Sequence, residues 1–158
     1  MLYIQIRNIW RVDGLYFLGI EKSFGTEAAS KIDEKCWRTM GKLEARQLKE
    51  LMQLKKWSVP KIMEALELTG WALDQRDKKI EVSKDRAVFR VISCGTQLTR
   101  VAKGLEVFPC RPIREGYLRA FAEELNPNIK VNCRLCPPGP RPDNKWCEWE
   151  FLFAKGAI

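Results

Sequence analysis

The chain has 158 residues, with 28 Lys and Arg against 20 Asp and Glu, so its formal net charge is +8. A chain of this length is typical of one domain with a core of its own. It contains no histidine, which excludes the commonest metal ligand and general base, and with them a standard serine or cysteine triad. The start shows neither a secretory signal nor an apolar run long enough for a membrane span, so we expect a cytoplasmic protein with no membrane partner.

The first part of the chain, residues 1–77, has the apolar spacing of helices. Over residues 3–24 the spacing is helical, and Gly14 predicts a break between two shorter helices. A second helix is predicted over about residues 27–55, and a third opens at Ser58. The apolar seam of the second helix, as on the core-facing side of an amphipathic helix, consists of Ile32, Cys36, Met40, Leu43, Gln47, Leu51 and Leu54.

The second part, residues 78–158, changes to the shorter period of strands. Two hairpins are expected, with helical segments between them. The predicted elements are strands at 79–82 and 87–93, one or two helical turns in 95–104, a helix at 112–125, and strands at 129–135 and 146–153. The fold class is therefore α+β: N-terminal helices packed on a small antiparallel sheet in the order strand-strand-helix-strand-strand, as one domain over 1–158.

Four cysteines give the strongest chemical signal. Cys133 and Cys136 have the two-residue spacing with which two thiolates share one metal ion. Cys147 returns on the next predicted strand, and Cys110 lies just before a predicted helix. Four sulfur ligands would suit Zn²⁺ or an iron–sulfur cluster. Two alternatives stay open: thiols buried as small apolar side chains, and a redox pair at Cys133 and Cys136.

Carboxylates occur within an apolar stripe of the second helix. The stripe consists of Asp33, Trp37, Met40, Glu44 and Leu48. If it faces the core, its carboxylates must be paired, protonated or bound to something. Asp33, Trp37 and Glu44 are therefore candidate ligand-binding residues. The alternative is a stripe at the solvent edge, with its acids paired to neighbouring basic residues.

Arg90 is the fourth candidate for ligand binding. It shares a face of its predicted strand with Val88 and Ile92. Glu148 or Glu150 could pair with it across the sheet, which would give it an architectural role instead.

Two stretches carry a resemblance to a known family. One runs from Asp13 to Glu21; the other runs from Lys103 to Cys110, through Cys133-Arg-Leu-Cys136-Pro-Pro, and closes with Cys147-Glu-Trp-Glu-Phe151. Together they resemble an uncharacterised family of archaeal and bacterial cytosolic proteins, a domain of unknown function. The order of helices, hairpin, helix and hairpin with late cysteines is also similar to four-vinyl-reductase-like domains. That similarity implies binding of small hydrophobic ligands, with zinc in some members.

Three hypotheses of function follow. The first is a small-molecule binding domain, with an apolar pocket between the helices and the sheet and a structural metal such as zinc at the cysteines. The second is a cysteine- or metal-dependent enzyme. The third is a basic module that binds nucleic acid or protein, which the scattered charges disfavour without excluding it. The sequence leaves a homodimer open.

Overall fold

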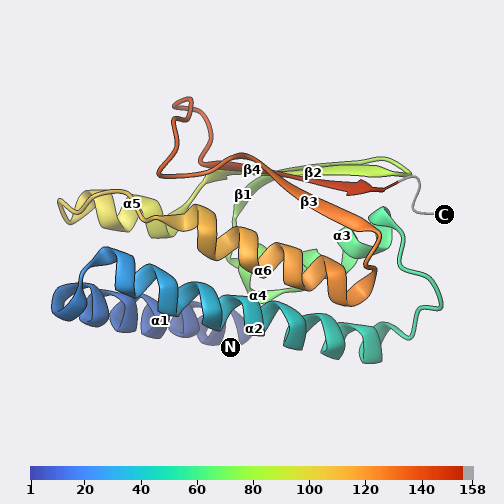
Figure 1. The fold of residues 1–158 in the computed structure, drawn as a ribbon, viewed down its shortest axis with the longest axis horizontal. Coiled ribbons are helices and arrows are strands. Elements are labelled where there is room, and N and C mark those ends of the chain that lie inside the picture. Colours follow the sequence, from blue (N-terminus) through green and yellow to red (C-terminus); the bar gives the residue numbers. More distant parts are fainter. Residues whose placement is uncertain (155–158) are drawn as a thin grey trace.

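The computed structural model describes residues 1–154, apart from the side chain of residue 2. A helical hairpin, a middle layer of shorter helices and a sheet lie one above another (Figure 1). The described helices are α1 (Leu2–Phe24), α2 (Thr26–Met52), α3 (Val59–Glu67), α4 (Gly70–Asp74), α5 (Gly95–Ala102) and α6 (Cys110–Leu125). The described strands are β1 (Asp77–Val82), β2 (Arg86–Ser93), β3 (Ile129–Leu135) and β4 (Cys147–Phe153). This arrangement confirms the predicted α+β class.

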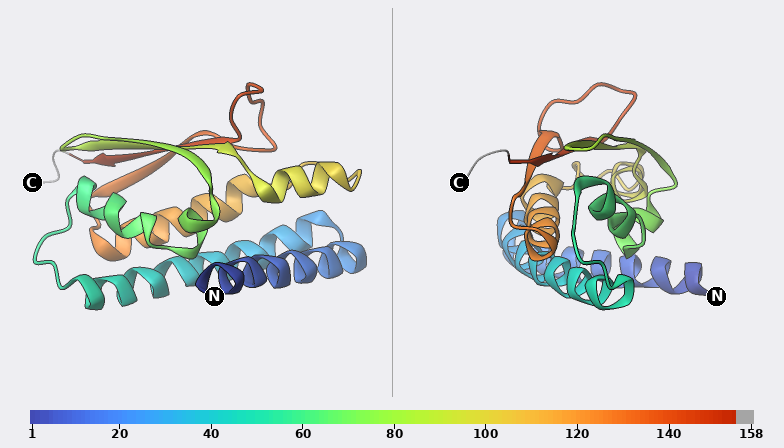
Figure 2. Two further views of the ribbon diagram at one scale, coloured as in Figure 1. Left: turned by 180° about the vertical axis from the view of Figure 1, so that it is seen from behind. Right: turned by 90° about the vertical axis from the view of Figure 1, so that its right-hand side faces the viewer.

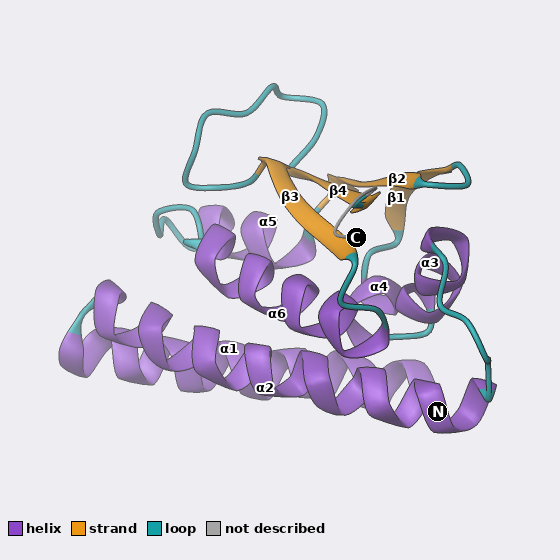
Figure 3. Cartoon of the chain, turned by 45° about the vertical axis from the view of Figure 1, so that its right-hand side comes forward, coloured by secondary structure: helices purple, strands orange, loops and turns teal. Residues whose placement is uncertain are grey.

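Helix α6 is the centre of the fold. It lies between the α1–α2 hairpin and the sheet, with α3 and α4 beside it and α5 near its N-terminal end (Figures 2 and 3). Its buried side chains lie on successive turns and include Tyr117, Leu118 and Phe121, each fully buried. Because α6 is covered on both sides, it joins the helical layer and the inner face of the sheet into one core.

The four strands form an antiparallel sheet in the order β1-β2-β4-β3. Phe89, Trp149 and Phe151 lie on its inner face with no measurable exposure. The pairing of β3 with β4 contains an irregularity, because Cys133 pairs with Trp149 whereas Leu135 pairs with Glu148. Two steps along β3 thus match one step along β4, as in a β-bulge, and this changes which face the following residues take.

The predicted break at Gly14 is wrong. Helix α1 continues from Leu2 to Phe24 without interruption. A glycine inside a helix lowers its stability by only about 1 kcal/mol relative to alanine. The stacking of Trp10 on Trp37 of α2, with ring centroids 4.7 Å apart, is one of the contacts that hold the helix in place.

The apolar seam predicted for the second helix is also wrong, because it faces solvent. Ile32, Leu43 and Leu51 are 46%, 43% and 75% exposed. The buried residues of α2 are instead Ala29, Asp33, Trp37, Gly41 and Ala45. Small residues on this face let α2 approach α6 closely: a Cβ at Gly41 would stand 2.5 Å from the Tyr117 carbonyl oxygen.

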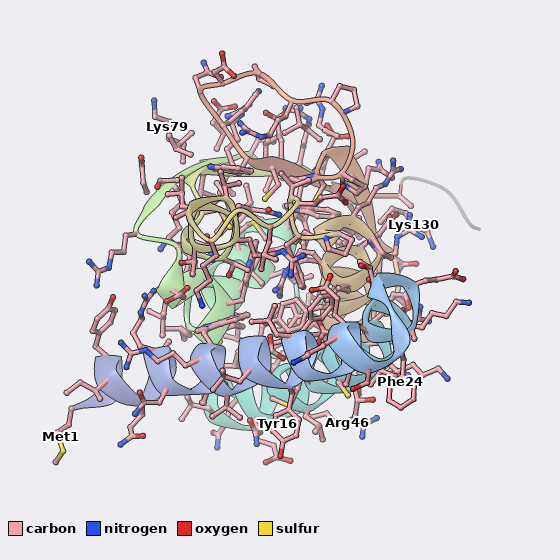
Figure 4. The ribbon with its side chains drawn as sticks, turned by 90° about the vertical axis from the view of Figure 1, so that its left-hand side faces the viewer. Met1, Tyr16, Phe24, Arg46, Lys79 and Lys130 are labelled. Atoms are coloured by element: carbon pink, nitrogen blue, oxygen red, sulfur yellow. The ribbon has the colours of Figure 1, made fainter. Side chains whose placement is uncertain are left out.

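The outer face of the α1–α2 hairpin therefore carries exposed apolar side chains. Tyr16 and Phe24 of α1 are 72% and 75% exposed and project away from the sheet (Figure 4). Within the described residues, none of the helices has the length and apolar character that crossing a membrane requires.

Candidate functional site

A cavity of about 340 Å³ lies among the helices, bounded by α1, α2, α4, α5 and the start of α6. Pockets that bind small molecules begin at about this size. Within the described chain, no residue of the four strands lines it. This cavity is therefore not the pocket expected between the helices and the sheet, which stays a prediction. The stripe containing Asp33 and Trp37 does face inward, and both residues line the cavity.

Arg114 of α6 reaches into the cavity from a ring of aromatic side chains. Its Cζ atom lies 5.6, 5.1 and 4.9 Å from the ring centroids of Trp10, Trp37 and Trp71, and 4.9 Å from that of Tyr117. The ring quadrupoles stabilise the guanidinium charge. Arg114 is only 5% exposed, and in the described chain its Nε and Nη1 have no hydrogen-bond partner. Buried donors without partners are rare, so this group requires an explanation.

Two carboxyl groups share the same cavity. Burial and, after it, the negative charge of Asp13 raise the pKa of Asp33 to about 7. Burial also raises the pKa of Asp13, whereas the hydrogen bond from Trp37 Nε1 (3.2 Å) and the charge of Arg114 lower it. About half of the Asp33 side chains therefore hold a proton at pH 7, and this protonated form donates a hydrogen bond to the Asp13 carboxylate. Asp33 Oδ2 has no partner among the described residues.

Ion pairs join α1 to the opposite walls of the cavity. Arg7 Nη1 lies 3.0 Å from Asp74 Oδ1 of α4. Arg100 of α5 donates two hydrogen bonds to the Glu21 carboxylate, at 3.0 and 3.1 Å, and these lower the pKa of Glu21. Phe17 is the one fully buried residue among the described side chains of α1. Ion pairs and hydrogen bonds therefore contribute much of the contact between α1 and the rest of the domain.

Cys110 is the first residue of α6 and lines the cavity, one helical turn before Arg114. A hydrogen bond from Cys136, together with the charge and a hydrogen bond of Arg114, lowers the pKa of the Cys110 thiol to about 7. A large share of this side chain is therefore thiolate at neutral pH, the form that reacts as a nucleophile.

The four cysteines singled out in the sequence come together around Cys136. Its thiol is within hydrogen-bonding reach of Cys110, Cys133 and Cys147, and donation of its one S–H to Cys110 is the chief cause that raises its pKa. The bond to Cys136 lowers the pKa of Cys133. Two local features explain the convergence. The β3 irregularity brings Cys136 beside Cys147, and a hydrogen bond from Arg111 N to Pro137 O (2.9 Å) holds the start of α6 against the same loop.

The arrangement of these thiols does not match a metal site. In the described part of the chain, no three or more cysteine, aspartate or glutamate side chains are placed so that they could hold one ion. The four thiols instead share hydrogen bonds centred on Cys136. A zinc ion at Cys110, Cys133, Cys136 and Cys147 stays a prediction.

Glu44 and Arg90 lie outside the cavity lining. Glu44 accepts a 2.6 Å hydrogen bond from the Tyr117 hydroxyl and so supports the aromatic ring behind the site. Arg90 is on the outer face of the sheet, where it pairs with Glu81 (2.6 Å) and Glu148 (2.8 Å). The cross-strand pair anticipated for Arg90 is therefore present, and ligand binding by these two residues stays a prediction.

Sequence reasoning did not include Arg114 among the site residues. The signal was present, because Arg114 lies four residues after Cys110 and so takes the same face of α6. It also lies among the apolar side chains that bury this helix. A basic residue on the buried face of a helix indicates a candidate site as much as the carboxylates of α2 do.

Comparison with known proteins gives a family without an assigned function. No curated protein matches the chain. A family model described as "Family of unknown function (DUF6125)" matches residues 1–153. The match includes every helix and strand described above, together with the cavity and the four cysteines. The chain belongs to this family of unknown function.

Proposed function

We propose that this domain binds a small, mostly apolar molecule that carries an anionic group, and that Arg114 holds this group in the cavity. The observation that carries the proposal is the buried guanidinium with two N–H groups that lack partners among the described residues. A carboxylate in the cavity would accept hydrogen bonds from these donors, and charge-assisted bonds of this kind are about twice as strong as neutral ones.

The aromatic lining supports binding of the apolar part of such a molecule. Trp10, Trp37 and Trp71 line the cavity together with Phe17 and Phe108. Aromatic side chains bind flat apolar groups through large contact areas and preferred ring geometries. The volume of about 340 Å³ suits a molecule no larger than a small metabolite.

The charges in the cavity are compatible with an anion. Asp74 is neutralised by Arg7, and Asp33 holds a proton near neutral pH because its pKa is raised to about 7. Arg11 and Lys103 add positive charge to the lining. The cationic groups thus exceed the ionised carboxylates around the ligand.

Binding of matched probes tests this proposal. Phenylacetate and phenylacetamide have nearly the same shape and differ in charge, and tryptophan fluorescence reports their binding because three tryptophans line the cavity. We expect phenylacetate to bind at least about tenfold more tightly than phenylacetamide, and Arg114→Gln to remove the difference. Arg119→Gln is the matched control, because Arg119 lies on the exposed side of the same helix. Equal affinity of the two probes, or no binding of either, contradicts the proposal.

A further inference from the structure

We propose that Cys110 is a nucleophile that forms a covalent bond with an electrophilic carbon of the anionic molecule held by Arg114. This inference rests on the proposed function and adds a reaction to it. Three side chains that line one cavity carry the argument: Cys110 at the start of α6, Arg114 one helical turn away, and Asp33 on the facing helix α2.

The position of Cys110 favours reaction over simple packing. Its side chain lines the cavity, whereas Cys136 and Cys147 are buried and absent from the lining. It occupies the first position of a helix of 16 residues, where the helix dipole favours a negative charge. The guanidinium of Arg114, one helical turn further along and in the same lining, adds a positive charge that favours a thiolate at this position.

Arg114 supplies the second and independent observation. It is 5% exposed, lines the cavity, and has two N–H groups without partners among the described residues. Because Arg114 lies beside Cys110, an anion bound by Arg114 is close to the Cys110 sulfur. Positioning of this kind replaces a random encounter by a local one, which accelerates bond formation strongly.

Asp33 completes the site as a source of a proton. For an electrophile with a carbonyl group, the Cys110 sulfur forms a bond to the carbonyl carbon, and the π electrons of the C=O bond move to oxygen. That oxygen takes the proton of the Asp33 carboxyl group, so the step needs no oxidant or metal. The negative charge of Cys110 is one of the causes that raise the pKa of Asp33. Formation of the C–S bond removes this charge and so makes Asp33 a better donor as the reaction proceeds.

The exposed Cys36 of α2 provides an internal control. Iodoacetate and iodoacetamide alkylate thiolates by the same displacement of iodide, and only iodoacetate carries a carboxylate. The rate of alkylation of each cysteine is measured by peptide mass spectrometry at neutral pH. We expect the ratio of the iodoacetate rate to the iodoacetamide rate to be at least about tenfold higher at Cys110 than at Cys36, because Arg114 attracts the anion.

Variants separate recognition from folding. Arg114→Gln should reduce the ratio at Cys110 to that at Cys36, Arg114→Lys should retain part of it, and Arg119→Gln should leave it unchanged. Circular dichroism verifies that each variant is folded. A ratio at Cys110 equal to that at Cys36 in the wild-type protein overturns the inference, as does a Cys110 that remains unmodified while Cys36 reacts.

Glyoxylate tests the carbonyl step. As an aldehyde with a carboxylate, it should form a reversible thiohemiacetal and protect Cys110 from iodoacetamide, whereas acetaldehyde at the same concentration should not. Failure of protection overturns the addition step. If phenylacetate binds but Cys110 shows neither selective alkylation nor protection, the covalent inference fails and the proposed binding function stands. If phenylacetate does not bind either, both fail.

Discussion

The side-chain amide of Gln97 forms two hydrogen bonds with the main chain of Phe108, two residues before Cys110. Nε2 donates to the Phe108 carbonyl oxygen at 2.9 Å, and Oε1 accepts from the Phe108 N–H at 2.8 Å. Gln97 is 1% exposed. The amide thus satisfies both main-chain groups as a neighbouring strand would, and it fixes the segment that leads into α6.

Replacement of Gln97 by leucine should loosen the segment that leads into α6 and so displace Cys110. Gln97→Leu keeps the approximate volume but leaves the Phe108 N–H without its partner, whereas the Phe108 carbonyl oxygen keeps the 2.7 Å hydrogen bond from the Cys110 N–H. We expect the free energy of unfolding to fall by on the order of 2 kcal/mol, and alkylation of Cys110 to slow because its position is no longer fixed. Denaturant unfolding and peptide mass spectrometry measure the two effects. Leu98→Ala, at a 49% exposed position of the same helix, should change neither, and an unaltered stability of Gln97→Leu would contradict the role of these bonds.

Asp33 should make the stability of the domain depend on pH. Its pKa is raised from 3.8 to about 7, so the folded state binds more protons than the unfolded state between these values. The contribution of Asp33 to stability is therefore full below about pH 4 and is lost as the pH rises toward about 7. Asp33→Asn cannot ionise and should lose this dependence. We expect the variant to gain up to about 3 kcal/mol over the wild type at pH 8 relative to pH 5.

Urea unfolding at the two pH values measures this difference. Subtraction of the wild-type curve from that of Asp33→Asn cancels the groups that do not interact with Asp33, and the remainder reports Asp33 together with its coupled neighbours Asp13 and Cys110. Asp143→Asn, in the exposed loop between β3 and β4, is the control and should show the same pH dependence as the wild type. Parallel curves for Asp33→Asn and the wild type would refute the raised pKa.

Cys136 should control the reactivity of Cys110. The hydrogen bond from Cys136 is the largest cause of the lowered pKa of Cys110, which is about 7 in place of 9.0. Cys136→Ala removes the donor and should raise the pKa of Cys110. The thiolate fraction at pH 7 then falls, although the remaining thiolate is intrinsically more nucleophilic, and the net rate should drop about fivefold. The pH profile of iodoacetamide alkylation at Cys110 measures the shift, with Cys36 as the reference thiol. An unchanged profile would show that Cys136 has no such effect.

Gly41 should be necessary for the contact between α2 and α6. The added Cβ of Gly41→Ala would stand 2.5 Å from the Tyr117 carbonyl oxygen, so the helices must separate. We expect a loss of about 1–3 kcal/mol, the usual effect of overpacking. Gly19→Ala is the matched control, because nothing lies within 4 Å of a Cβ at that helical position. It should stabilise the domain by up to about 1 kcal/mol through helix propensity. Thermal unfolding compares the two, and equal effects would exclude a steric cause.

Local patterns predicted most of the fold. The hairpin around residue 84 and the last two strands follow from alternation and turn residues, which act over a few positions. Gly14 and the face of α2 could not be decided in this way. The choice between the seam of Ile32 and Leu43 and the face of Ala29 and Gly41 depends on how closely another helix approaches. That distance is a property of the tertiary structure, which overrides local hydrophobicity.

Part of the candidate site could be predicted from the sequence. The clustering of the cysteines followed from strand order, and the inward direction of Asp33 and Trp37 was one of two stated alternatives. The cavity itself forms only where α1, α2, α5 and α6 pack together. The spacing of residues within one segment does not predict how separate helices pack. Metal binding, nucleic acid as a partner and a homodimer remain predictions.

The attachment of α1 has a consequence for the passage of molecules into the interior. Phe17 is the one buried residue among the described side chains of this helix, and Trp10 and Ile20 are partly buried against the core. Ion pairs from Arg7 to Asp74 and from Glu21 to Arg100 add to this packing, and dissolved ions weaken exposed charge pairs much more than buried ones. Added salt should therefore act first on the link at Arg7, whose side chain is 38% exposed and lines the cavity, so entry beside Arg7 should depend on ionic strength more than entry beside Arg100.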